Sequence, residues 1–130
     1  MLGDLRGTTI AVWGLTYKPG TDTLRRSGAI ETCRRLAAKG ASIQAYDPAV
    51  SQLPAPLARI IRLAATAEAA LAGASALVVS TAWPEFLQVP AAAVKERMRR
   101  PLVLDAARFL GNSLGKEGGI QYLTVGKPVT

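Results

Sequence analysis

The sequence predicts an α/β protein: a three-layer sandwich in which helices cover a mostly parallel sheet of five to six strands. Short apolar runs alternate with helix-like amphipathic segments along the chain. Hydrophobic residues make up 49% of the 130 residues and aromatic residues only 5%, so Val, Ile, Leu and Ala must supply most of the core. A chain of this length is in the usual range for one domain, and we expect a single domain over residues 1–130.

The first expected elements are a buried strand and an amphipathic helix. Residues 8–12 form an apolar run that Gly14 ends, as is typical of a buried strand followed by a turn. Ser27 is a favourable N-cap residue for a helix. Gly40 can adopt the left-handed conformation that often ends one. We therefore expect a helix between Ser27 and Gly40.

Residues 42–46 form the second expected strand, which Asp47 and Pro48 end. A strand, a helix and a second strand join as parallel neighbours through a right-handed crossover. Ligands of such units collect outside the carboxyl ends of the strands. The polar loop 15–27 is therefore the expected functional loop.

The second half of the chain continues the alternation of strands and helices. Pro90 can open a helix and Pro101 can end it, and the last strand is expected at an edge of the sheet. The expected elements are a strand at 59–63, a helix at 67–72, a strand at 76–81, a helix at 90–98, and strands at 102–104 and 120–125.

The chain carries a formal charge of +7 and no histidine, which favours an anionic partner such as a phosphate-bearing ligand or nucleic acid. Two basic groups, Arg34 with Arg35 and Arg97 with Arg99 and Arg100, fall on or next to expected helices without interleaved exposed aromatic residues. This arrangement is typical of solvated helix faces and disfavours nucleic acid.

Nothing in the sequence predicts a membrane or secretory protein. No stretch approaches the roughly 20 apolar residues of a membrane span, and the N-terminus lacks a signal-peptide pattern. The single cysteine, Cys33, cannot form an internal disulfide, which fits a reducing compartment. We expect a cytoplasmic protein without a membrane partner.

The loop after the first strand is the most informative stretch of the chain. Gly14 permits a tight departure from the strand, and the following helix offers free N–H groups to an anion. Lys18 and Arg25 add two cations, so a phosphate or diphosphate is the natural ligand. Alternatively, Lys18 is a solvated loop residue and Asp22 forms a helix-capping ion pair with Arg25.

Two familiar phosphate-binding loops are excluded by this stretch. Residues 14–27 contain no second glycine at the spacing of the dinucleotide fingerprint and no glycine-lysine-serine or glycine-lysine-threonine run of a P-loop. We expect a Rossmann-like fold without that fingerprint, in which side chains and helix N-termini hold a nucleotide.

Residues 10–25 resemble the opening of the C-terminal, UDP-binding domain of the UDP-glucose/GDP-mannose dehydrogenase family. In that family a strand runs into Gly-Leu-x-Phe-Lys-Pro-x-Thr-Asp-Asp-x-Arg. Four further segments resemble the same domain in the same order: 45–48, 76–86, 102–108 and 122–126.

The resemblance implies a role for each matching position. Tyr17 and Lys18 would face a bound nucleotide sugar, and Arg108 would contact the same ligand. Arg25 would approach the diphosphate of NAD, which a missing N-terminal domain would mainly bind. The full enzyme would be a homodimer that oxidises the sugar C6 alcohol to a carboxylate for polysaccharide biosynthesis, and this chain alone would not be catalytic.

The chain departs from the family pattern in the loop and in later motifs. Thr23 replaces the second Asp, Arg26 replaces an acidic residue and Gly28 replaces a proline. Ala82 replaces the Glu before the family's tryptophan, and Arg108 stands one place late. These departures leave open which nucleotide sugar is bound.

Three other residues invite functional interpretations that the sequence does not favour. Cys33 lies on the apolar stripe of the first helix and is expected to pack in the core, whereas the family's catalytic cysteine lies upstream of this domain. Trp13 lies within a strand and is expected in the core as well, although Trp13 and Trp83 could stack on a base.

Two other classes of protein compete with the dehydrogenase interpretation. A stand-alone CoA-binding or other Rossmann-like nucleotide-binding protein would share the strand, the Gly-Leu turn and the polar loop. The Tyr17-Lys18 pair and the segment around Trp83 argue against it. A purely structural or oligomerisation module is the third interpretation.

Overall fold

The structure, a computed structural model, describes residues 7–15, 28–81, 83–105 and 119–123. Within these residues, six strands form one sheet in the order β3-β2-β1-β4-β5-β6, and every neighbouring pair is parallel. The strands are β1 (Thr9–Trp13), β2 (Ser42–Tyr46), β3 (Ile61–Leu63), β4 (Ala76–Val79), β5 (Leu102–Asp105) and β6 (Gln121–Leu123). The order reverses between β1 and β4, which makes this pair the topological switch point of a doubly wound sheet.

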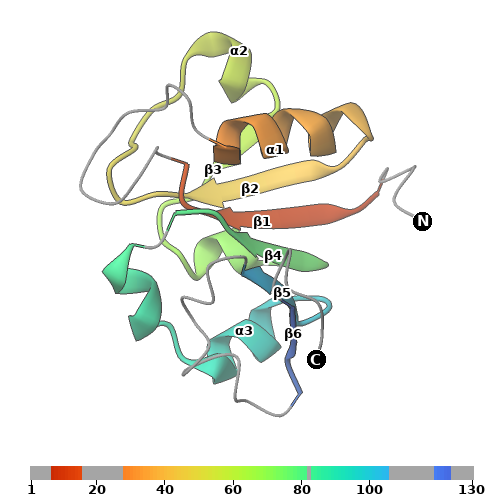
Figure 1. Cartoon of the computed structure of the whole chain (residues 1–130), viewed down its shortest axis with the longest axis vertical. Helices are drawn as coiled ribbons and strands as arrows, with labels where there is room; N and C mark the ends of the chain where they lie inside the picture. Colours follow the sequence, from red (N-terminus) through yellow and green to blue (C-terminus); the bar gives the residue numbers. More distant parts are fainter. Residues whose placement is uncertain (1–6, 16–27, 82, 106–118, 124–130) are drawn as a thin grey trace.

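Helices cover both faces of the sheet, as the sequence predicts. Figure 1 shows α1 and α2 on one side of the strands and α3 on the other. The helical elements in the described part of the chain are α1 (Gly28–Ala38), α2 (Ala55–Ala58), α3 (Ala91–Arg97) and the 3₁₀ helices η1 (Ala69–Leu71) and η2 (Pro84–Gln88). The predicted α/β sandwich is confirmed, with six strands and a fully parallel sheet in the described residues.

Strand β1 divides the core into two layers because its side chains alternate between the faces of the sheet. Ile10 and Val12 pack with the buried residues of α1 and α2. Ala11 and Trp13 pack with those of η1, η2 and α3. Both layers lie against one strand that is buried over most of its length, as expected for the centre of a parallel sheet.

Helix α1 ends as the sequence predicts, with Gly40 in the left-handed conformation at φ 99°. The N–H of Gly40 donates to the Ala37 carbonyl at 2.9 Å, and the N–H of Ala41 donates to the Leu36 carbonyl at 3.1 Å. This pair of bonds is a Schellman motif and satisfies two carbonyls at the helix end. The predicted N-cap, Ser27, lies outside the described residues.

The helix predicted over 67–72 is wrong, because only the 3₁₀ turn η1 forms there. Two side chains of the sheet donate hydrogen bonds to backbone carbonyl groups of this stretch, which would otherwise accept hydrogen bonds within a longer helix. The indole Nε1 of Trp13 donates to the Ala67 carbonyl at 2.9 Å. Gln44 Nε2 donates to the carbonyls of Ala70 and Ala72, both at 3.0 Å. These tertiary bonds satisfy the backbone without another helical turn.

Other boundaries differ by a few residues from the predicted ones. Strand β4 ends at Val79 and not at 81, because the N–H groups of Ser80 and Thr81 turn toward the Trp13 carbonyl at 2.9 and 3.4 Å. The sequence did not predict α2 or η2, both of which begin at a proline-containing segment. The predicted edge position of the last strand is confirmed by β6.

Cys33 is fully buried in α1, as expected, and burial raises the pKa of its thiol to about 12. Because the thiolate is the reactive species, native Cys33 is expected to react with iodoacetamide at pH 8 on the order of 1000-fold more slowly than in the unfolded chain. Mass spectrometry of samples alkylated with and without urea measures both rates. Equal rates in the two states would contradict this burial.

Candidate functional site

The candidate site lies at the carboxyl edge of β1, β2 and β4, where the arrowheads of β1 and β2 lie side by side in Figure 1. The N–H of Gly14 donates to the Tyr46 carbonyl at 2.8 Å and so ties the end of β1 to the end of β2. The carbonyl of Trp13 accepts the N–H of Ser80 from the segment after β4. Three segments that are distant in the sequence therefore meet at the carboxyl edge around the end of β1.

Gly14 is required at this point by both conformation and space. Its φ is +94°, which L side chains rarely adopt. A Cβ at this position would lie 2.4 Å from Thr81 Cβ and 2.5 Å from the Thr81 backbone nitrogen. The chain thus leaves β1 in direct contact with the segment after β4, which confirms the tight departure predicted for Gly14.

Asp47 connects the same three segments through its side chain. The residue is 1% exposed, and its carboxylate accepts three hydrogen bonds from the described part of the chain. Oδ2 accepts the Leu15 N–H at 2.7 Å and the Trp83 Nε1–H at 3.0 Å. Oδ1 accepts the Ala49 N–H at 2.8 Å. A buried carboxylate is tolerated because it receives such bonds.

The sequence analysis did not single out Asp47 and treated it only as the end of a strand. Its place after β2 was the available signal, because an acidic residue at this place is part of the dinucleotide-binding pattern. The indole of Trp83 is partly buried and donates to Asp47, so its ring is oriented by the protein.

Aromatic side chains pack together at the ends of β1 and β2. Trp13 is fully buried and stacks on Phe86 with ring centroids 4.9 Å apart, which confirms its predicted core position. Tyr46 meets Phe86 edge-on at 6.3 Å and donates its hydroxyl to Glu85 Oε2 at 2.8 Å. Burial, followed by the hydrogen bond to Glu85 and the charges of Glu85 and Asp47, raises the pKa of Tyr46 to about 12.

A second buried carboxylate ends β5. Asp105 is fully buried, and its Oδ2 accepts the Tyr122 hydroxyl of β6 at 2.8 Å. The bond links the end of β5 to the middle of its neighbour β6. The segment 106–118, which contains Arg108, follows Asp105 in the sequence.

A hollow of about 470 Å³ opens at the carboxyl ends of β2 and β3. Its lining includes Tyr46, Asp47, Pro48, Ser51 and residues 63–65. No lysine or arginine belongs to the described lining. A diphosphate bound at this edge would therefore need cations from elsewhere, and the segment 16–27 supplies Lys18 and Arg25 in the sequence.

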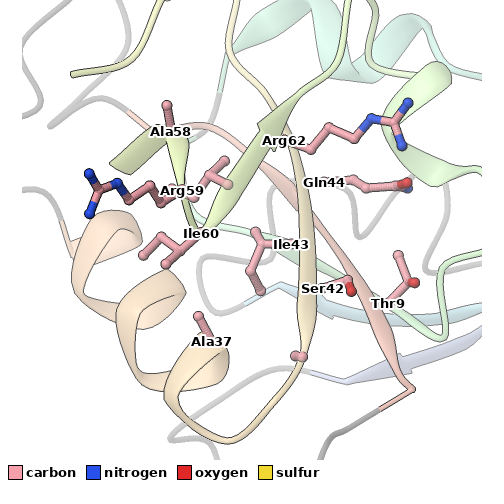
Figure 2. A pocket seen from close by; sticks show the side chains of 11 residues that line it. Thr9, Ala37, Ser42, Ile43, Gln44, Ala58, Arg59, Ile60 and Arg62 are labelled. Atoms are coloured by element: carbon pink, nitrogen blue, oxygen red, sulfur yellow. The ribbon is translucent and has the colours of Figure 1, made fainter. Parts of the chain in front are cut away.

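A larger groove of about 600 Å³ lies at a different place, between α1, β2 and β3. Figure 2 shows its two arginines, Arg59 and Arg62, extending away from each other, so they do not converge on one anion. Its lining also includes Thr9 and Ser42, the first residues of β1 and β2. Ligands of parallel sheets bind at the opposite, carboxyl ends of the strands, so this groove is not the candidate site.

The four predicted site residues lie outside the described residues. Tyr17, Lys18 and Arg25 belong to 16–27, and Arg108 belongs to 106–118. The residues that precede these segments, Leu15 and Asp105, both lie at the carboxyl edge of the sheet and are both buried.

The described residues also bear on the predictions about basic groups, metal sites and membrane spans. Arg34 and Arg35 on α1 and Arg97 on α3 are exposed, as predicted for solvated helix faces, whereas the exposed Arg99 and Arg100 lie after the end of α3. Within the described ranges, no three His, Cys, Asp or Glu side chains gather as a metal site would require. No helix in those ranges has the length and hydropathy of a membrane crossing.

The strand order, the glycine at the switch point and the ligand-accessible carboxyl edge define a Rossmann-like nucleotide-binding domain. The chain belongs to the UDP-glucose/GDP-mannose dehydrogenase family, because the model of that family's UDP binding domain matches residues 11–112. The predicted family is thereby confirmed.

Individual relatives agree with this assignment. A UDP-glucose 6-dehydrogenase of Bacillus subtilis is 37% identical over 127 residues, which are 97% of this chain and 29% of that protein. A UDP-D-ManNAc dehydrogenase from Pyrococcus horikoshii has a similar structure, with a TM-score of 0.74 at 25% identity over 95% of this chain and 26% of that one. A UDP-glucose dehydrogenase from Pyrobaculum islandicum gives 0.67 at 31% identity over 80% of this chain and 23% of that one.

The chain spans less than a third of the length of these relatives. The relatives are dehydrogenases named for UDP-sugars. The alternative of a stand-alone CoA-binding protein is therefore not favoured.

Proposed function

We propose that this chain binds a UDP-sugar and forms the C-terminal domain of a longer, NAD-dependent dehydrogenase that oxidises the sugar C6 alcohol to a carboxylate. The observation that carries the proposal is the family match over 11–112, which includes the whole of segment 16–27 and the first part of segment 106–118, with Arg108. On this proposal, residues 1–130 are one domain, and the remainder of the protein supplies the dinucleotide fingerprint, the cysteine and the base. Since the named relatives act on UDP-sugars, a UDP-sugar is preferred to a GDP-sugar.

The proposed roles of the loop residues follow from their chemistry. Lys18 offers a point charge to the phosphates of the nucleotide sugar, and Tyr17 lies beside it in the sequence. Arg25 offers a planar fork that can bind the NAD diphosphate through two parallel bonds. Arg108 contacts the nucleotide sugar from the segment after β5.

The proposal extends to the assembly and its place in the cell. The full enzyme is proposed to be a cytoplasmic homodimer that supplies precursors for polysaccharide biosynthesis. Nucleic acid and membranes are not proposed as partners. Light scattering of the full-length protein measures whether it is a dimer.

A titration followed by amide NMR tests the binding function. UDP-glucose is expected to shift the resonances of Gly14, Leu15 and residues 17–25, whereas CoA is not. Lys18→Ala is expected to weaken UDP-glucose binding about 10- to 100-fold, because a hydrogen bond to a charged group is lost. Lys39→Ala, on the exposed residue after α1, is the control and is expected to leave the affinity unchanged. A response to CoA alone, or equal affinities for both variants, would overturn the proposal.

A further inference from the structure

We infer that Asp47 is a positioning residue of the nucleotide site, which holds Leu15, the residue just before the segment 16–27 in the sequence, against the ends of β2 and β4. The inference rests on the proposed function, because it assigns a role within that site. Asp47 is not assigned to ligand contact. Its carboxylate instead fixes Leu15, the residue from which the chain enters the segment that contains Tyr17 and Lys18.

The geometry joins three strand ends at one side chain. The donors to Asp47 are the N–H of Leu15 after β1, the N–H of Ala49 after β2 and the indole of Trp83 after β4. Leu15 and Trp83 share one oxygen, Oδ2, at 2.7 and 3.0 Å. A movement of either group away from the others therefore breaks or lengthens a bond to the same atom.

Burial raises the free-energy cost of losing any of these hydrogen bonds. Asp47 is 1% exposed and Leu15 is fully buried, so water does not readily replace a lost partner. A charged acceptor in such surroundings strongly favours the one arrangement that supplies its donors. The backbone at Leu15 is consequently fixed before any ligand arrives, which lowers the ordering cost of binding.

The same contacts distinguish this site from that of a dinucleotide-binding domain. In those domains an acidic residue associated with the end of the second strand binds a ribose hydroxyl of the cofactor. Asp47 follows β2, but both of its oxygens accept protein donors and the side chain is enclosed. The geometry therefore opposes binding of an NAD ribose at this carboxylate.

Two variants of this chain test the inference. Asp47→Asn keeps the shape but cannot accept the same set of bonds, and Trp83→Phe removes only the indole donor. Val94→Ala, in the buried part of α3, is the control for a general loss of stability. For each protein, NMR gives the exchange rate of the Leu15 amide and the affinity for UDP-glucose.

Asp47→Asn is expected to speed exchange of the Leu15 amide and weaken UDP-glucose binding, each about 10-fold or more relative to Val94→Ala. Trp83→Phe is expected to show smaller changes in the same direction. The variant that combines Asp47→Asn with Trp83→Phe is expected to lose no more affinity than Asp47→Asn alone. Trp83 acts on the site through its hydrogen bond to Asp47, so its effect is already contained in that of Asp47→Asn. If Asp47→Asn fails to fold, Trp83→Phe carries the test with the same two measurements.

The inference is overturned if the Leu15 amide exchanges no faster in either variant than in Val94→Ala. It is also overturned if affinity falls only as far as in that control. NAD-dependent shifts at Ala49 that disappear in Asp47→Asn would assign the carboxylate to ligand contact instead. Failure of the unaltered chain to bind UDP-glucose would overturn the proposed function, while Leu15 exchange would still decide whether Asp47 fixes this backbone.

Discussion

Gly14→Ala is expected to lower the free energy of unfolding by about 2–5 kcal/mol, from about 1–2 kcal/mol of left-handed strain and about 1–3 kcal/mol of overpacking. Gly14 has a φ of +94°, and its added Cβ would lie 2.4 Å from Thr81 Cβ and 2.5 Å from Thr81 N. Because two of the three nearest atoms belong to the Thr81 backbone, a rotamer change cannot relieve the clash. Urea denaturation followed by circular dichroism measures the loss.

Two glycine controls separate the two contributions. Gly73 has a φ of +70° but open space where a Cβ would lie, so Gly73→Ala tests backbone strain alone. Gly28 begins α1 without a positive φ and has no atom within 4 Å of the place that a Cβ would take, so Gly28→Ala is expected to be nearly neutral. A Gly14→Ala protein no less stable than Gly73→Ala would show that Thr81 does not restrict this position.

Trp13→Ala is expected to lower the free energy of unfolding by about 3–5 kcal/mol, as is common for large aromatic residues in cores. The side chain is fully buried, stacks on Phe86 at 4.9 Å and donates Nε1 to the Ala67 carbonyl at 2.9 Å. The substitution removes packing on both sides of the ring and leaves that carbonyl without its indole donor. A loss of this size is a large fraction of the roughly 5–15 kcal/mol that typical domains possess.

Trp13→Phe distinguishes packing from hydrogen bonding. It retains an aromatic ring but removes Nε1, so the expected loss is smaller than for alanine, at about 1–3 kcal/mol. Leu87→Ala, at a residue that is 45% exposed, is the control and is expected to change stability by less than about 0.5 kcal/mol. The comparison uses urea midpoints at constant slope. A loss for Trp13→Ala no greater than for Leu87→Ala would contradict the core role of Trp13.

The sequence predicted most strands and the two longer helices because their signals are local. Residues 42–46 and 102–104 alternate or concentrate apolar side chains between turn residues, and β2 and β5 form there. Gly40 ended α1 because glycine tolerates the left-handed conformation that the Schellman motif needs. Motif order likewise identified the family, since the resemblance used segments along most of the chain and the match covers 11–112.

The short helical segments were less predictable because distant residues decide them. The Ala-rich stretch at 67–72 favours a helix by composition, but Trp13 and Gln44 bind its carbonyl groups. The turn η2 after Trp83 is similarly placed where its Phe86 can stack on Trp13. The residues near 67–72 and 84–88 do not indicate by themselves where β1 lies, because Trp13 is more than 50 residues away in the sequence.

For the candidate site, the sequence by itself determined the loop, its glycine and its cations, because residue type fixes conformational freedom and charge. Tyr17, Lys18, Arg25 and Arg108 remain predictions from sequence. Only the tertiary structure decided the hydrogen-bond partners of Asp47, since an aspartate after a strand can face a ligand or the protein. Parallel pairing of β2 with β1, and of β1 with β4, brings Leu15 and Trp83 to the same carboxylate and encloses it.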